Sequence, residues 1–203
     1  MQAFAVTNHG PEVTDGVHPY HFQNLGAVPR YINEVAVLRG IECNILNRDA
    51  EIDFDERWLN HLEIVIASIH QSEYRPLTEQ EHTETLLKVI GNPVVNIMGH
   101  MGREPMPFDI ERVVKAAKKH GKLVEINSSS LNWGGRITSR CREIALMCKK
   151  HKAPVVVNSD SHICYSVGNV ENAIALLESI DFDESLVMNT DLEKIKNYLN
   201  INF

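Results

Sequence analysis

The 203-residue sequence lacks a long apolar run, a closely spaced pair of cysteines and a glycine-rich phosphate-binding loop. No apolar stretch approaches the roughly 20 residues of a membrane span, and the N-terminus lacks the pattern of a signal peptide. Neither GxGxxG nor GxxxxGK[ST] follows a predicted strand, which disfavours the nucleotide-binding α/β folds. The four cysteines include no CxxC pair and are typical of reduced thiols, so we expect a cytoplasmic protein without a disulfide framework.

The sequence also lacks a block of basic residues. The formal net charge is -7, with 27 acidic against 20 basic side chains. This balance disfavours nucleic acid as a partner. With 43% hydrophobic residues, the chain is long enough to bury a sizeable core, and we expect residues 1–203 to form a single domain.

The most informative stretch covers residues 154–162. Pro154 to Val157 are apolar and favour a strand buried on both faces. They lead into Asn-Ser-Asp-Ser-His, which ends in Asp160 and His162. A buried strand that carries such groups at its C-terminal end is how an α/β barrel presents catalytic groups or metal ligands.

The rest of the chain alternates strands with helices. Apolar runs predict strands over residues 3–7, 34–44, 64–69, 93–98, 123–127 and 186–189, besides the strand before Asn158. Helices are predicted over residues 56–62, 78–91, 110–120, 139–151, 170–180 and 191–199, with a capping box of Thr78 and Glu81. An amphipathic stretch is expected over 25–32 and a loop over 11–22. Because the strands are apolar throughout, a parallel α/β sheet, closed or nearly closed into a barrel, is expected.

A barrel places the C-terminal ends of all its strands on one face. Residues of ligand type follow five strands there, and that face would collect His9, Glu42, His70, His100, Asn127, Asp160 and His162. Each histidine alone is more often structural, but the recurrence predicts a metal site. Imidazole nitrogens and carboxylate oxygens suit Zn, Mn and Fe. Such ions hydrolyse phosphate esters, because they clamp the reacting oxygens and lower the pKa of a bound water from about 15.7 to about 7.

Other polar residues have competing interpretations. His61, His82, His120 and His151 lie on predicted helices or their ends, where a solvated position is expected. His18 and His21 lie in the loop over residues 11–22, which could cover the site. Arg39, Arg103, Arg136 and Arg142 are candidate phosphate clamps, of which we expect at most two to serve. The serines at 128–130 either donate to a phosphate or cap a helix.

The order of these short motifs resembles the PHP (polymerase and histidinol phosphatase) family, in particular its YcdX-like phosphatase branch. The resemblance rests on the segments TNHG (7–10), GIE (40–42), ASIH (67–70), GH (99–100), EINSS (125–129) and SDSH (159–162), and on CREIA (141–145). It spans nearly the whole chain, and the six motifs in the same order are far more specific than any of them alone.

The resemblance implies a distorted seven-stranded (βα) barrel of TIM-like type. It also implies hydrolysis of a small phosphorylated substrate, a phosphomonoester, through a metal-bound hydroxide. The cofactors would be up to three zinc or manganese ions, or iron. Carried over motif by motif, Glu42 would bridge two metals, His70 and His100 would complete one site, Asp160 would belong to a second, and His9 with His162 to a third. Glu42, Asp160 and His162 are then the candidate catalytic residues. The candidate substrate-binding residues are His18, His21, Asn127, Ser128 and Arg142.

The sequence departs from the family pattern at its beginning. The family opens with a His-x-His strand and a helix, and this sequence starts one strand later. Met1 is then either an internal methionine of a longer active protein or the start of a shortened one. An open barrel edge predicts a homo-oligomer or a tail that covers it. In addition, Asn8 replaces an Asp that could orient His9, and Met101 and Arg103 replace the Pro and Asn of a His-Pro-Gly-Asn run.

Two alternatives to an active phosphatase remain at this point. The chain could be a metal-binding, catalytically weak or inactive relative, because the ligands of the first strand are absent. It could also be a metal-dependent amide hydrolase on a similar barrel, which the lack of an obvious bridging lysine disfavours.

Overall fold

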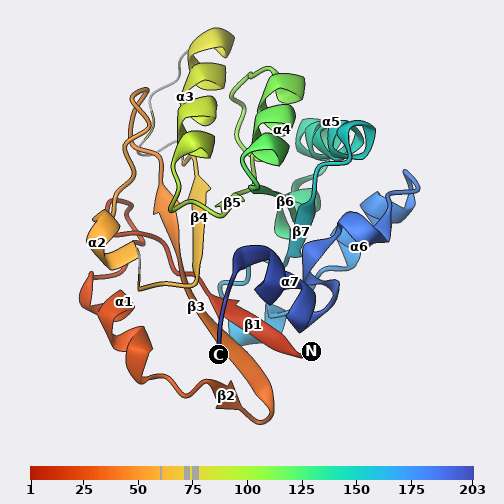
Figure 1. The fold of residues 1–203 in the computed structure, drawn as a ribbon. Helices are drawn as coiled ribbons and strands as arrows, with labels where there is room; N and C mark the ends of the chain where they lie inside the picture. Colours follow the sequence, from red (N-terminus) through yellow and green to blue (C-terminus); the bar gives the residue numbers. More distant parts are fainter. Residues whose placement is uncertain (60, 71–73, 75–77) are drawn as a thin grey trace.

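The computed structural model describes residues 1–59, 61–70, 74 and 78–203. A curled parallel sheet forms a half-barrel, with strands in the order β1-β3-β4-β5-β6-β7 (Figure 1). A seventh strand, β2 (Tyr31–Ile32), pairs antiparallel with β3. The parallel strands are β1 (Ala3–Val6), β3 (Val35–Asn44), β4 (Ile64–Ser68), β5 (Ile97–Met98), β6 (Leu123–Asn127) and β7 (Val155–Asn158). The α/β class and the parallel sheet predicted from the sequence are confirmed.

Helices connect the strands, and most of them cover one face of the sheet (Figure 1). In the part of the chain that the structure describes, they are α1 (Tyr20–Asn24), α2 (Glu56–Leu59), α3 (Glu79–Gly91), α4 (Ile110–Lys119), α5 (Gly135–His151), α6 (Glu171–Glu178) and α7 (Leu192–Leu199). The predicted capping box is present at the start of α3, where Glu81 N–H donates to Thr78 Oγ1 and the Glu81 carboxylate accepts from Thr78 N–H. None of the helices described has the length and apolar character needed to cross a membrane.

The two faces of the sheet carry different kinds of side chain, because successive residues of a strand point to opposite sides. The outer face packs against α3 to α6 in the main apolar core, to which Ile41, Val65 and Val124 contribute. The inner face holds a second apolar cluster, in which Leu38, Ile66, Ile97, Leu123 and Val156 pack against Met188, Ile195 and Ile201. Helix α7 and the C-terminal residues thus cover the lower part of the inner face.

Toward the C-terminal ends of the strands, the inner face becomes polar. Beyond the apolar positions, and on the same side of each strand, lie Glu42, four residues after Leu38, and Ser68 and Glu125, two residues after Ile66 and Leu123. These side chains are buried, as are Asn44 and Asn127 at the next inward positions. Buried polar groups need partners, so this end of the half-barrel is where a functional site is expected.

The strand predicted over residues 186–189 is wrong. The chain forms two 3-10 turns there, Glu184–Leu186 and Met188–Thr190, with a single bridge between Val155 and Val187. The side chain of Asn189 explains the difference. Its amide donates to Val157 O at 2.6 Å and accepts from Val157 N–H at 3.0 Å. The amide thereby replaces the backbone partners that a strand would give to β7.

The structure also differs from the sequence-based prediction over residues 20–32 and at one histidine. The stretch over 25–32 forms a 3-10 helix (Leu25–Ala27) followed by β2, and α1 occupies the end of the expected loop. The solvated position expected for His82 is wrong, because the side chain is buried and contacts Pro107 O at 2.9 Å. It lies on the same face of α3 as Leu86, four residues on, and that face packs into the core.

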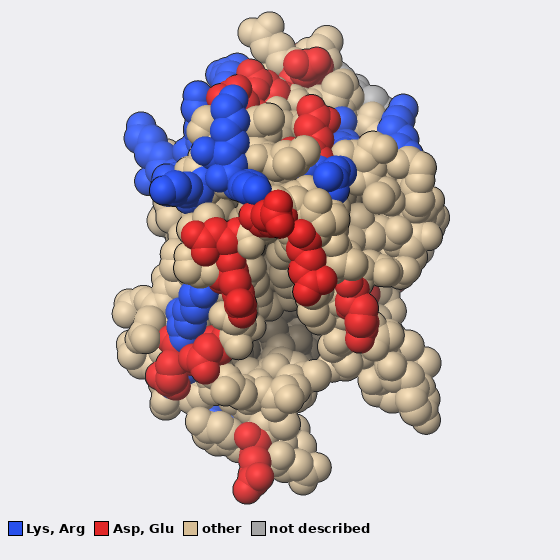
Figure 2. All heavy atoms as spheres, turned by 90° about the vertical axis from the view of Figure 1, so that its right-hand side faces the viewer, with Lys and Arg blue, Asp and Glu red and all other residues tan. Residues whose placement is uncertain are grey.

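One face of the molecule is uneven in charge and is hollowed below its middle (Figure 2). Figure 2 shows lysine and arginine side chains gathered over the upper part of one face and acidic side chains across its middle, above a hollow. A cavity of about 490 Å³ lies at the N-terminal ends of the strands, between the start of the chain, the β2–β3 turn and the start of α7. Its lining includes Glu34, Asp191 and Glu193. The histidine cluster lies at the opposite edge of the sheet, because His9, His70 and His100 follow the C-terminal ends of β1, β4 and β5.

The exact seven-stranded (βα) barrel, the missing first strand and the oligomer stay predictions. Among the described residues, β1 pairs in the sheet with β3 alone. The four cysteines are free, as expected, and Cys43 and Cys148 are buried in the core.

Candidate metal centre

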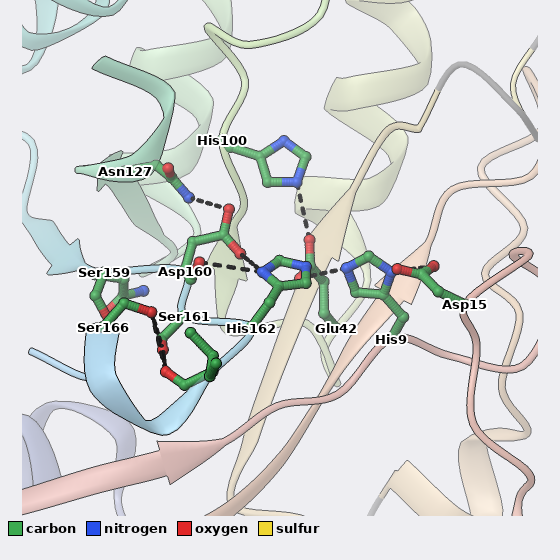
Figure 3. A network of polar contacts seen from close by, with 12 residues as sticks. His9, Asp15, Glu42, His100, Asn127, Ser159, Asp160, Ser161, His162 and Ser166 are labelled. Atoms are coloured by element: carbon green, nitrogen blue, oxygen red, sulfur yellow. Dashed lines mark hydrogen bonds and ion pairs between the residues drawn. The ribbon is translucent and has the colours of Figure 1, made fainter. Parts of the chain in front are cut away.

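The carboxylate of Glu42 is the centre of the polar end of the half-barrel. Three imidazoles from three other strand ends face it: His100 Nε2 at 2.9 Å, His9 Nε2 at 3.4 Å and His70 Nε2 at 3.6 Å. His9 follows β1, His70 follows β4 and His100 follows β5. Figure 3 shows Glu42 between His100 and His9. The structure therefore brings together four of the residues that the strand-end pattern selected.

Protons are shared unevenly within this cluster. The hydrogen bond with Glu42 raises the pKa of His9 to about 9, against the opposing effect of burial. Burial acts to lower the pKa of His100, but its hydrogen bond and charge interaction with Glu42 outweigh burial and raise that pKa. Burial acts to raise the pKa of Glu42, yet hydrogen bonds with His100 and His9 hold it well below its usual value. Without a metal, the carboxylate is thus charged and is neutralised by imidazolium.

His70 is held in a different state from the other two imidazoles. Its Nδ1 lies 2.6 Å from Asn44 Oδ1. The orientation of that amide is fixed, because Asn44 Nδ2 donates to Asp53 Oδ2 at 2.6 Å and Asn44 N–H donates to Asp53 Oδ1 at 2.7 Å. Nδ1 therefore carries the proton of His70. Burial, and then the positive charge of His100, lower the pKa of His70 to about 4, so the ring is neutral.

The remaining nitrogen of His70 provides a test of whether a metal fits. Nε2 carries a lone pair, is buried, and has no hydrogen-bond partner. It faces Glu42 Oε1 at 3.6 Å, so two electron-rich atoms lie opposite each other. A buried acceptor without a partner is costly, and a cation would satisfy both atoms. Ligand atoms of His9, Glu42 and His70 all lie within 4.8 Å of one another. The residues present therefore fit a divalent metal ion.

A second group of ligand type shares His9, because ligand atoms of His9, Asp15 and His162 also lie within 4.8 Å of one another. His9 Nδ1 is 3.0 Å from Asp15 Oδ1 (Figure 3). A neutral imidazole has one lone pair and one N–H. If Nε2 binds a metal, Nδ1–H donates to Asp15, an arrangement that commonly orients metal-binding histidines. Asp15 then fills the orienting role that Asn8 cannot fill.

The carboxylate of Asp160 does not join either group. It forms an ion pair with Arg103 and accepts a hydrogen bond from Asn127 Nδ2 at 3.2 Å. Its other oxygen lies 3.7 Å from His162 Nδ1. Figure 3 shows Asp160 on the side of His162 that is turned away from His9 and Asp15. The role of Asp160 as a metal ligand stays a prediction.

Glu125 supports the backbone around the cluster. Burial raises its pKa. Its carboxylate accepts from His100 N–H at 2.6 Å, from Asn158 Nδ2 at 2.8 Å and from Asn127 Nδ2 at 3.2 Å. It thereby ties the ends of β5, β6 and β7 together beside the histidines.

The remaining candidate residues, those for phosphate and substrate binding, lie in different parts of the structure. Asn127 lies in the site, beside Asp160 and Glu125, and Ser128 is buried just after it. Arg142 donates to Ser179 Oγ at the end of α6, and Arg39 donates to Val28 O. The ring of His18 lies against that of Tyr20, and Tyr20 N–H donates to His18 Nδ1 at 3.2 Å. His21 lies against Phe22. A role of these residues in substrate binding stays a prediction, as it does for Asn127, Ser128 and Arg142.

Sequence reasoning missed Asp15 and Asp53 entirely. Both lie in connecting segments and not at strand ends, so the pattern that found the imidazoles could not find them. Gly10 offered an indirect signal. A Cβ atom at Gly10 would lie 2.3 Å from Asp53 Oδ2, so only glycine lets that carboxylate approach Asn44.

The fold and site together define an α/β half-barrel with a histidine and glutamate cluster at the C-terminal ends of its strands. No family model matches the chain. Similar proteins include a probable phosphatase of Caldanaerobacter subterraneus subsp. tengcongensis, 44% identical over 201 residues, which cover 98% of this chain and 79% of that protein. A probable phosphatase of Shewanella piezotolerans is 39% identical over 205 residues, with coverage of 98% and 81%. The chain belongs to the family of these probable phosphatases.

Two solved structures share the fold at low sequence identity. One is the histidinol phosphate phosphatase of Lactococcus lactis, complexed with zinc, L-histidinol and phosphate; it is 14% identical, with a TM-score of 0.58, over 90% of this chain and 83% of that one. The other is a chain of an archaeal ribonuclease P with mature tRNA, 15% identical, with a TM-score of 0.61, over 98% of this chain and 81% of that one. At these identities the likeness concerns the fold alone.

Metal binding should strengthen as the pH rises. The pKa of His9 is raised to about 9, so at neutral pH a proton occupies the ring and competes with a metal. We expect the zinc affinity to rise about tenfold per pH unit between pH 6.5 and 8.5 for each proton released. Competition with a chromophoric chelator at three pH values measures this, after correction for the chelator's own pH dependence. A zinc affinity that is independent of pH would contradict the assignment of His9 as a ligand.

Replacing Asp15 should weaken metal binding without unfolding the protein. Asp15→Asn removes the charge that holds His9 Nδ1–H, and loss of such an outer partner typically costs about 10–100-fold in metal affinity. Because the Asp15 side chain is 64% exposed, the free energy of unfolding should change by less than about 0.5 kcal/mol. Asp49→Asn, at a 72% exposed side chain that pairs with Lys88, is the matched control for zinc titration.

Two glycines should respond in opposite ways to alanine. A Cβ atom at Gly99, next to His100, would lie 2.1 Å from Ser68 Oγ and 2.8 Å from Ile66 Cγ2. We expect Gly99→Ala to destabilise the protein by about 1–3 kcal/mol. A Cβ atom at Gly91, at the end of α3, meets nothing within 4 Å, and Gly91→Ala should be neutral or stabilising by up to about 1 kcal/mol. Urea denaturation measures both, and an equal loss in the two variants would contradict this explanation.

Proposed function

We propose that the protein is a metal-dependent phosphomonoesterase of the PHP family, in its YcdX-like branch, acting on a small phosphorylated substrate. The observation that carries the proposal is the buried, unpartnered lone pair of His70 Nε2 facing the carboxylate of Glu42. A site that needs a cation to be satisfied, in a chain related to probable phosphatases, supports hydrolysis with metal assistance.

His9, Glu42, His70 and His100 would hold the metal, with zinc, manganese or iron as the suitable ions. The metal would supply positive charge to the phosphoryl oxygens and acidify a water molecule. Glu42 provides the negative charge that attracts the ion into a buried site. Asn44 and Asp15 fix the rings of His70 and His9, so that their Nε2 atoms point at the same space.

The two remaining candidate catalytic residues lie at the edge of this cluster. In phosphomonoester hydrolysis, water oxygen attacks phosphorus, the bond from phosphorus to the alcohol oxygen breaks, and that oxygen takes up a proton. The His162 side chain is 63% exposed, whereas those of His9, His70 and His100 are nearly covered. Its ring lies 5.8 Å from that of His9. We assign His162 to proton delivery to the leaving group, with Asp160 orienting it.

The test is hydrolysis of p-nitrophenyl phosphate by protein purified without chelator. We expect activity with added zinc or manganese, loss of activity with EDTA, and recovery when metal is restored. Metal content per chain is measured on the same samples by elemental analysis. Bound metal without hydrolysis of this or other phosphomonoesters would contradict the proposal and favour a metal-binding relative without turnover.

A further inference from the structure

Arg103 lies in the turn that follows the metal-facing His100. Its N–H donates to His100 O at 2.8 Å, and its side chain extends toward the end of β7. There the guanidinium forms an ion pair with Asp160, and its Nε donates to Ser130 Oγ at 3.1 Å. The Arg103 side chain is only 21% exposed. It is therefore part of the floor of the site and not a surface charge.

Asp160 is held in place for this contact. Its φ of 52° lies in the left-handed region, which aspartate adopts more readily than most residues other than glycine. One oxygen receives both Arg103 and Asn127 Nδ2, and the side chain is only 10% exposed. The negative charge of Asp160 is thus already neutralised by a cation that belongs to the protein.

The guanidinium that neutralises Asp160 differs from the imidazoles that neutralise Glu42. Arginine does not lose its proton at physiological pH, so a divalent ion at Asp160 would face a permanent positive charge. In a partly buried site this repulsion is only weakly screened. Beside Glu42, by contrast, His70 Nε2 is buried, faces the carboxylate at 3.6 Å and has no hydrogen-bond partner. Cation binding is therefore favoured at Glu42 and opposed at Asp160.

We propose that the guanidinium of Arg103 takes the place of a metal ion at Asp160, so that this site binds a phosphoryl group between metal on the Glu42 side and a fixed guanidinium. The inference rests on the proposed function, which it deepens by assigning the second cation of the site. In the described part of the chain, Nη1 of Arg103 has no hydrogen bond, whereas Nε and Nη2 do. Two N–H groups are thus left to donate to phosphoryl oxygens, which guanidinium binds well.

The test compares metal content per chain in four proteins equilibrated with excess zinc and then freed of unbound ions. We expect the wild-type protein and Asp160→Asn to hold the same number of ions. Arg103→Asn should hold one more, because Asp160 becomes available. Adding Asp160→Asn to Arg103→Asn should remove that extra ion. Arg136→Asn, at an exposed position at the start of α5, changes the net charge equally and should match the wild type.

A second measurement examines phosphate itself. Isothermal titration of inorganic phosphate into the zinc-loaded proteins should show at least about tenfold weaker binding for the Arg103→Asn/Asp160→Asn double variant than for the wild type. Arg103→Lys keeps the positive charge and should keep the wild-type metal content. It therefore tests the inference even if Arg103→Asn does not fold, which circular dichroism would reveal.

The outcomes separate the two proposals. If Asp160→Asn in the wild-type background loses one ion, Asp160 is a metal ligand and the inference about Arg103 is overturned while the metal centre stands. An unchanged metal content in Arg103→Asn overturns it as well. If the wild-type protein binds no zinc, the metal centre and the proposed function fail together with the inference.

Discussion

Glu42→Ala is expected to abolish metal binding and phosphatase activity. Among the residues that the structure describes, Glu42 carries the one carboxylate that forms ion pairs with His9, His70 and His100 together, and its removal leaves three imidazoles around an uncharged space. Loss of an outer partner of a metal ligand already costs about 10–100-fold in affinity. Loss of Glu42, the proposed ligand shared by the whole cluster, should exceed that, so we expect at least a 100-fold lower zinc affinity and no measurable hydrolysis.

Elemental analysis and the p-nitrophenyl phosphate assay measure these two effects on the same preparation. The matched control is Glu143→Ala, which makes the same substitution at an exposed position on α5 and should leave both quantities unchanged. In the metal-free Glu42→Ala protein, the pKa of His9 should fall from about 9 toward its ordinary value of about 6.5, which NMR titration can follow. A Glu42→Ala protein that keeps metal and activity would show that the site lies elsewhere.

The sequence predicted that the side chains of His9, Glu42, His70 and His100 gather around one point, because their positions follow from a simple rule, and their role as metal ligands stays a proposal. Parallel strands end on one face, and His9, Glu42, His70 and His100 lie at or near the ends of four strands. No contact had to be known in advance. The α/β class followed in the same way from apolar strands that alternate with helices, and the sharp start of α3 followed from its capping box.

The features that the sequence failed to predict depend on side-chain contacts between residues that are not neighbours in the chain. The apolar run of residues 186–188 has the composition of a strand, but Asn189 binds the edge of β7 through its side chain. The orienting residues Asp15 and Asp53 act from loops, across gaps of 6 and 9 residues to His9 and Asn44. Arg103 was one of four candidate clamps in the sequence, and only its ion pair with Asp160 distinguishes it.

Asp53→Ala is expected to combine a large loss of stability with a loss of metal affinity. The buried carboxylate accepts from Asn44 N–H at 2.7 Å, Asn44 Nδ2 at 2.6 Å and Glu12 N–H at 3.1 Å. Leaving buried donors unsatisfied costs about 1–3 kcal/mol each, so the free energy of unfolding should fall by roughly 3 kcal/mol or more. Urea denaturation of the metal-free protein measures this, with the exposed Asp49→Ala as a control expected to change it by less than about 0.5 kcal/mol.

The effect of Asp53→Ala on metal affinity follows from the orientation of Asn44. Without Asp53, the amide is free to turn its nitrogen toward His70 Nδ1. His70 would then carry its proton on Nε2, which faces Glu42 and the proposed metal position, and zinc affinity should fall about 10–100-fold. Asn44→Ala should produce the same loss of affinity. If Asp53→Ala lowers stability but leaves the zinc affinity at the wild-type value, Asp53 secures the loop around Gly10 alone, and the proton on His70 is placed by the imidazole's own preference.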